Sequence, residues 1–183
     1  LEPIAEKWTA AADAVIEVPE IPEGTDLAES IAKGRELFFG DKANCVKCHG
    51  VTALGDGQAN DYDDWSKNIV KIETKLDGLA LAKESDAEER RWAGEFREVL
   101  AGDALKPRTI PPRNLRQGIY RGGRRPVDLY YRIHAGINGA PMPAAKGTVD
   151  PQDIWHIVNY IRSLPYGLDG EAGADRTQAV VPA

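Results

Sequence analysis

The chain has 183 residues, of which 42% are apolar and 28% are charged, and its formal net charge is −6. These values suit one globular domain with a sizeable insertion, and the negative charge argues against a role in binding nucleic acid. No apolar run approaches the roughly 20 residues that cross a bilayer as a helix.

The N-terminal part of the chain predicts a short helix followed by a connector. Residues 1–16 mix small, apolar and charged residues, and they lack the continuous apolar stretch of a signal peptide. Prolines and a glycine break the pattern over residues 18–24, so we assign residues 1–24 to an N-terminal extension. We expect a mature form or an excised soluble domain, and an anchor or fusion partner removed from it would leave no trace in this sequence.

A second helix is predicted after Asp26, which is a suitable N-cap residue. Apolar residues and Gly34 follow at helical spacing as far as Phe38, and Gly40 is the expected end. The stretch 52–60 is rich in glycine and polar residues and predicts a loop.

The stretch 61–102 carries apolar and aromatic residues at helical intervals. We predict two or three helices here, with a break near Gly78 or Ser85. Asp86 followed by Glu89 suits the start of a helix. Residues 106–117 contain three prolines, which exclude a regular helix.

Two further helices are predicted near the C-terminus. Pro126 suits the first turn of a helix that ends near Ala135, and residues 136–147 form a loop rich in glycine and proline. Asp150 and Pro151 begin the last helix, which should end near Leu164. Its expected buried stripe consists of Ile154, Ile157, Val158, Ile161 and Leu164. No strand-like alternation of useful length is present, and residues 169–183 should form a flexible tail.

The segment Cys45-Val46-Lys47-Cys48-His49 forms a CxxCH motif, and its two cysteines are the chain's full complement. In such a motif two thiols add to the two vinyl groups of a haem, and the adjacent histidine becomes the proximal iron ligand. A thioredoxin-like dithiol would need a βαβ setting, and a zinc site would need four ligands. An accidental occurrence with two structural cysteines is the remaining alternative.

Met142 is the single methionine of the chain and lies between Pro141 and Pro143 in the 136–147 loop. Methionine is usually a core filler, but that role is less natural in a rigid loop between prolines. A thioether is a suitable haem ligand, so we predict Met142 as the second axial ligand beside His49. The competitors are His134, at the end of a predicted helix, and His156, which we expect to be exposed opposite the buried stripe.

Further features resemble class I bacterial cytochromes c. They are Gly34 and Phe38, Gly-Asp-Gly at 55–57, Pro-Arg-Asn-Leu at 112–115, the loop 139–143, and the last helix with Trp155 and Tyr160. The order of elements matches over about residues 27–60 and 108–165, whereas 61–107 has no counterpart and is interpreted as a helical insertion. The resemblance implies an all-α class I cytochrome c fold over residues 25–168, with crossed N- and C-terminal helices around one covalent haem c.

The resemblance also implies particular contacts and a location. The first and last helices of this family cross at a small residue, which would be Gly34 against Tyr160 or Ile157. A backbone carbonyl of a loop proline accepts the free N–H of the haem histidine, and by position this is Pro112, with Pro111 as the alternative. Proteins of this type are bacterial and extracytoplasmic, so a periplasmic location in a respiratory system is expected.

Charge is distributed unevenly along the chain. Residues 56–103 contain thirteen acids and seven bases, whereas residues 108–132 contain seven arginines and one acid, Asp128. One interpretation spreads the arginines over the surface, where they pair with the acidic insertion. In the other, Arg113 or Arg121 binds the haem propionates, with Tyr120 also within reach, and further arginines form part of a docking surface for a redox partner.

The sequence therefore favours an electron carrier, or an electron-entry domain, whose iron has both axial positions filled. A haem enzyme is the first alternative, and it requires an open or displaceable sixth position. A ligand sensor in which Met142 leaves the iron on reduction is the second. The sequence identifies neither the donor nor the acceptor.

Overall fold

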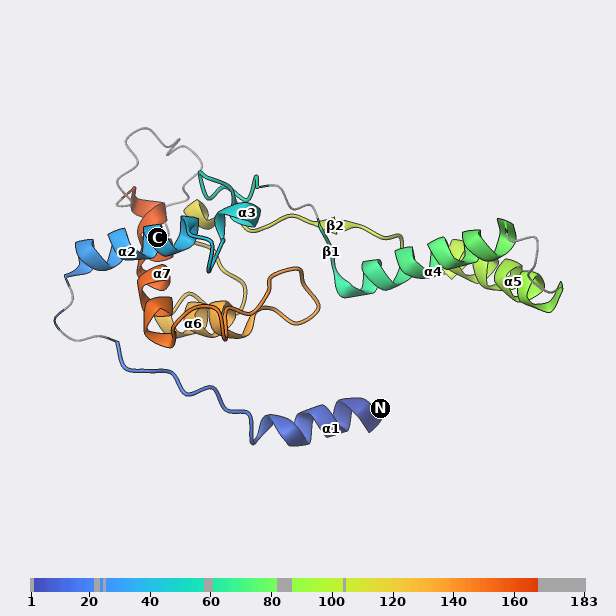
Figure 1. Ribbon diagram of the computed structural model, residues 1–183, viewed down its shortest axis with the longest axis horizontal. Coiled ribbons are helices and arrows are strands. Elements are labelled where there is room, and N and C mark those ends of the chain that lie inside the picture. The colour runs from blue at the N-terminus through green and yellow to red at the C-terminus, as the bar shows by residue number, and fades with distance from the viewer. Residues whose placement is uncertain are drawn as a thin grey trace.

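The computed structural model describes residues 2–21, 24, 26–57, 61–81, 87–103 and 105–167. Its helices are α1 (Glu2–Ala11), α2 (Leu27–Phe39), α3 (Val46–His49), α4 (Asp64–Leu81), α5 (Ala87–Asp103), α6 (Pro126–Ala135) and α7 (Pro151–Ser163), with the 3₁₀ turns η1 (Leu115–Gln117) and η2 (Leu164–Tyr166). Two short strands, β1 (Asp61–Tyr62) and β2 (Thr109–Ile110), pair antiparallel. The regular secondary structure of the described part of the chain is thus mostly helical (Figure 1), which confirms the predicted fold class.

Helices α2 and α7 cross and form the centre of the fold (Figure 1). Gly34 lies at the crossing, where an added Cβ would be 2.8 Å from Tyr160 Cβ and would overlap the His156 carbonyl. The absence of a side chain at Gly34 therefore sets how closely the two backbones approach. This confirms the expected small residue and its contact with Tyr160.

Helix α7 supplies more residues of the main core cluster than any other element. The Asp150 side chain accepts a hydrogen bond from the Gln152 N–H, and Pro151 occupies the first turn, as predicted. All five residues of the predicted stripe are buried. Helix α6 packs beside α7, and the rings of Tyr130 and Trp155 lie 4.8 Å apart.

The expectation for His156 was wrong, because its side chain is buried between α2 and α7. His156 Nδ1 lies 2.8 Å from Ser30 Oγ, which also accepts a hydrogen bond from Asn159 Nδ2 at 2.9 Å. Nearly every residue of α7 from Ile154 to Ile161 is buried, so α7 is covered on more than the one face that its apolar residues mark. A polar residue in that covered region needs a partner, and Ser30 provides it.

The insertion consists of the α4–α5 hairpin, which Figure 1 shows projecting from the β1–β2 pair. Gly78 lies inside α4, so the break does not fall at this one of its two expected positions; α4 ends at Leu81 and α5 begins at Ala87, and the other position, Ser85, lies outside the described residues, as does Asp86. Ile69, Leu76 and Ala93 are buried in the hairpin. The predicted helices are present, but not every apolar residue spaced at helical intervals is buried. The exposed ones include Trp65, Trp92 and Val99.

The N-terminal extension is tied to the core at one end. Trp155 Nε1 donates a hydrogen bond to the Pro19 carbonyl at 2.9 Å, and Ile16 and Val18 pack against the core. Helix α1 covers most of the segment predicted to be helical. The predicted tail, 169–183, lies outside the described residues. Among the helices that are described, none has the length and apolarity needed to cross a membrane.

Candidate functional site

The short helix α3 places both cysteines and His49 on a single turn. Cys45 precedes α3, and its carbonyl accepts hydrogen bonds from the backbone N–H groups of Cys48, at 3.2 Å, and His49, at 2.9 Å. Residues three apart on a helical turn share a face, so the two thiols lie on one side of the turn. Both thiols are free and half-buried, and burial raises the pKa of Cys45 to about 11.

The loop after α3 folds back over it through glycines. The N–H of Gly55 donates to the His49 carbonyl at 2.9 Å, and the N–H of Gly57 donates to the Cys48 carbonyl at 3.2 Å. An added Cβ at Gly57 would lie 2.5 Å from the Cys48 carbonyl oxygen, and one at Gly55, where φ is +85°, would overlap the Pro112 carbonyl. The Gly-Asp-Gly sequence thus permits a contact too close for side chains.

His49 is oriented by a backbone carbonyl, although not by the predicted one. Its Nδ1 lies 3.0 Å from the Arg113 carbonyl oxygen, whereas the Pro112 carbonyl faces Gly55. Burial lowers the pKa of His49, and the hydrogen bond to Arg113 partly opposes this effect. A neutral ring that donates from Nδ1 presents an unprotonated Nε2, which is the form that binds a metal.

The Met142 loop leaves α6 and returns toward the core. The N–H of Ile137 donates to the Met142 carbonyl at 3.2 Å, and the N–H of Ala145 donates to the Ile133 carbonyl at 2.9 Å. The Met142 side chain is half-buried and packs against the main core cluster. His134 instead remains on α6, where its ring stacks on that of Tyr130 with centroids 5.9 Å apart.

Cys45, Cys48 and His49 fit a covalent haem, and Met142 is a chemically suitable further ligand. Two thiols on one helical turn, an oriented imidazole and a half-buried thioether are the groups that c-type attachment and axial ligation use. Within the described ranges, no three His, Cys, Asp or Glu side chains gather in a way that could hold a metal ion. A zinc site of the usual four ligands is therefore not formed by these residues.

The predicted propionate ligands occupy different settings. The side chains of Arg113 and Arg121 are exposed. The Tyr120 hydroxyl lies 3.4 Å from the Leu115 carbonyl and 3.3 Å from the Ile161 carbonyl, to which it can donate. Burial raises the Tyr120 pKa to about 12. These contacts favour packing as the role of Tyr120, while Arg113 and Arg121 remain predictions.

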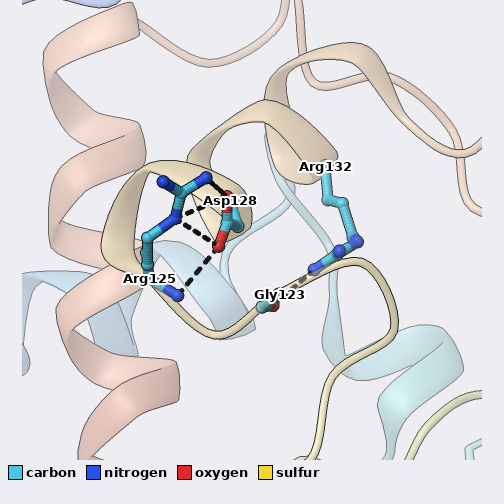
Figure 2. A network of polar contacts seen from close by, with 4 residues as sticks. All are labelled: Gly123, Arg125, Asp128 and Arg132. Carbon is cyan, nitrogen blue, oxygen red and sulfur yellow. Dashed lines mark hydrogen bonds and ion pairs between the residues drawn. The ribbon is translucent and has the colours of Figure 1, made fainter.

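Two other arginines of the basic stretch act within the fold (Figure 2). The Arg125 backbone N–H and guanidinium both bond the Asp128 carboxylate at the start of α6, with Nη2 to Oδ1 at 2.8 Å. This contact holds the pKa of Asp128 below its usual value. Arg132 Nη1 donates to the Gly123 carbonyl at 3.2 Å. Some arginines of the 108–132 stretch therefore stabilise the fold, in addition to those that are only exposed.

Sequence reasoning missed Arg116. Its side chain is only 4% exposed, and its Nε donates to the Thr52 carbonyl at 2.5 Å. Asn114 caps η1 by accepting the Arg116 N–H at 2.9 Å. The Asn-Leu-Arg sequence carries the signal for that cap, but the count of charges gives no sign that one arginine of seven is buried.

Comparison with known proteins agrees with this geometry. The Cytochrome c family profile matches residues 31–165. A solved structure of a reducing HAO-like protein complex from Kuenenia stuttgartiensis has a similar fold, with a TM-score of 0.52 and 22% sequence identity. The match covers 85% of this chain and 54% of that one, so the chain spans about half the length of its structural neighbour. No curated protein matches the chain.

Proposed function

This chain belongs to the cytochrome c family, and we propose from that premise that it passes electrons between protein partners with both axial positions of its haem iron filled, by His49 and Met142. Haem c is attached covalently through Cys45 and Cys48. When bound, the haem supplies a one-electron couple between ferrous and ferric iron.

The hydrogen bond between His49 and the Arg113 carbonyl carries the proposal. It holds the imidazole in one orientation and one tautomer, with Nε2 free to bind iron. An acceptor at Nδ1 also makes the ring a stronger electron donor. His49 is therefore prepared as a permanent ligand.

Met142 supports closure of the opposite side of the iron. Its loop is fixed at both ends by backbone hydrogen bonds to α6 and within the loop, and its side chain packs against the core. A thioether held in this way needs little rearrangement to remain bound in both oxidation states. Electron transfer is fast when neither oxidation state requires the ligands to move.

The ferric absorption spectrum tests this ligation. We expect a sulfur-to-iron charge-transfer band at the red end of the spectrum, and its loss in Met142→Ala. The matched controls His134→Gln and His156→Gln should keep the band. A high-spin ferric spectrum, or carbon monoxide binding to the ferrous wild type at neutral pH, would instead favour the haem-enzyme or ligand-sensor alternative.

We also propose a periplasmic or otherwise extracytoplasmic location in a respiratory system, with redox proteins as partners. The exposed side chains of Arg121 and Arg124 place positive charge on a chain that is acidic overall, which suits docking of an acidic partner. The structural neighbour is itself part of a protein complex.

Haem staining of the periplasmic fraction of the source organism tests the location. The fall of the electron-transfer rate with added salt tests the docking surface.

A further inference from the structure

Two segments far apart in the sequence contact each other next to α3, the short helix that carries Cys48 and His49. One is the loop 50–57 and the other is the segment 112–118. The N–H of Leu115 donates to the Ala53 carbonyl at 2.9 Å, and Gly55 lies against the Pro112 carbonyl. The second segment also contains Arg113, whose carbonyl orients His49. The position of this carbonyl therefore depends on how the two segments are joined.

Arg116 also joins the two segments, through a hydrogen bond that lies at matching sequence spacing from the bond of His49. Thr52 lies three residues after His49, and Arg116 lies three residues after Arg113. The bond between His49 Nδ1 and the Arg113 carbonyl is thus repeated three residues later by the bond from Arg116 Nε to the Thr52 carbonyl. The two hydrogen bonds and the two short segments close a ring. The atoms of each bond can therefore move less than they could if the other bond were absent.

The burial of Arg116 indicates a role beyond solubility. A guanidinium loses its hydration when it is buried, and this cost must be offset by hydrogen bonds. Arg116 is 4% exposed, whereas Arg113 and Arg121, three and five residues away, are exposed. The turn that carries Arg116 is fixed as well, because Asn114 caps η1.

We propose that Arg116 is a positioning residue for the axial histidine. By holding the 112–118 segment on the 50–57 loop, it keeps the Arg113 carbonyl at hydrogen-bond distance from His49 Nδ1. Arg116 thereby strengthens the electron donation of His49 to the iron without touching it. This inference rests on the proposed ligation of iron by His49.

The exchange of the His49 Nδ1 proton with solvent, followed by NMR of the haem-loaded protein, tests the proposal. Arg116→Met removes the donor but keeps an apolar side chain of similar length for the buried site. We expect exchange to accelerate about five- to tenfold, which corresponds to the loss of one ordinary hydrogen bond. Arg116→Lys retains a cation with N–H donors but loses the planar guanidinium, so its exchange rate should lie between those of wild type and Arg116→Met.

The control is Arg162→Met, which removes the same charge from an exposed position on α7 and should leave the exchange unchanged. Unaltered exchange in both Arg116→Met and Arg116→Lys overturns the proposal, even if both variants unfold at a lower temperature. If Arg116→Met does not fold, the Arg116→Lys result decides by itself. Failure of the proposed ligation has a separate signature, because the His49 ring protons of wild type would then lack the large shifts of an iron ligand.

Discussion

Gly34 of α2 lies against the backbone of His156 in α7, so close that a methyl group on Gly34 would overlap the His156 carbonyl. The contact belongs to the crossing of the two longest helices of the haem-binding fold. Both helices also carry the buried polar residues of the crossing, Ser30 and His156. The crossing therefore sets the distance between the helices, and it also provides hydrogen-bond partners for the polar groups buried there.

Gly34→Ala should destabilise the protein by about 1–3 kcal/mol, because the helices must separate to admit the methyl group. The control is Gly94→Ala in α5, where an added Cβ meets nothing within 4 Å. That variant should be stabilised by about 0.5–1 kcal/mol, since alanine loses less backbone entropy in a helix. Thermal unfolding of both variants measures the two effects. Equal stability of Gly34→Ala and wild type would contradict the close approach of α2 and α7.

His156 should make stability depend on pH. Its pKa is lowered, mainly by burial and then by Lys33, while Asp153 and Glu29 act in the opposite direction. The unfolded chain therefore takes up a proton that the folded chain resists. Stability is full above the ordinary histidine pKa of about 6.5 and decreases as the pH falls below it.

The midpoint of urea unfolding, measured between about pH 5.5 and 8, reports this dependence. His156→Gln keeps a polar partner for Ser30 and should flatten the curve in this range. A slope that persists in His156→Gln would assign the pH dependence to another group.

Much of the haem-binding fold was predictable because its signals are local. The proline at the start of α6 and the apolar stripe of α7 depend on short spacings, and the structure has the helices where these signals place them. The glycine at the helix crossing followed from the family resemblance. A helical glycine can also be tolerated in open space, as at Gly78, which explains why α4 continues through this residue.

The remaining differences depend on tertiary contacts. The burial of His156 arises because α2 covers a second face of α7, and an apolar stripe cannot show that. The acceptor for His49 is one residue from the predicted one, since the direction of a loop carbonyl depends on backbone angles that the sequence leaves open. The burial of Arg116 depends on the 50–57 loop, about 60 residues earlier, so the local charge pattern could not reveal it.

The α4–α5 hairpin should be removable without loss of the haem site. Tyr62 and Thr109 are directly paired in the β1–β2 ladder, so a two-residue Asn-Gly turn can replace residues 63–108. The deletion removes the hydrogen bond from the Asp64 N–H to the Gly139 carbonyl, but Gly139 is exposed and water can replace the donor.

We expect the shortened protein to keep its covalent haem and its charge-transfer band, with a thermal midpoint within about 5 °C of wild type. Intact mass, the ferric spectrum and thermal unfolding measure these three properties. Loss of the band in a protein that retains haem would mean that the hairpin supports the Met142 loop and is part of the domain.

Two tyrosines, the buried Tyr130 and the half-buried Tyr120, should respond in opposite directions to loss of their hydroxyl groups. The Tyr130 hydroxyl is buried and has no hydrogen-bond partner within the described part of the chain, so it adds desolvation cost without a compensating contact. Tyr130→Phe should therefore be neutral or stabilising by up to about 1 kcal/mol. Tyr120→Phe removes a hydroxyl that is placed to donate to the Leu115 or Ile161 carbonyl, and it should destabilise by about 0.5–1.5 kcal/mol.

Urea unfolding of both variants, together with the midpoint potential of the haem, distinguishes the two tyrosines and tests the earlier propionate hypothesis. If Tyr120 only packs, Tyr120→Phe lowers stability and leaves the potential unchanged, because no group near the iron has been altered. A changed potential with unchanged stability would restore Tyr120 as a propionate ligand. Strong destabilisation of Tyr130→Phe would show that its hydroxyl is hydrogen-bonded in the haem-loaded protein, since the aromatic packing of Phe at this position is otherwise the same.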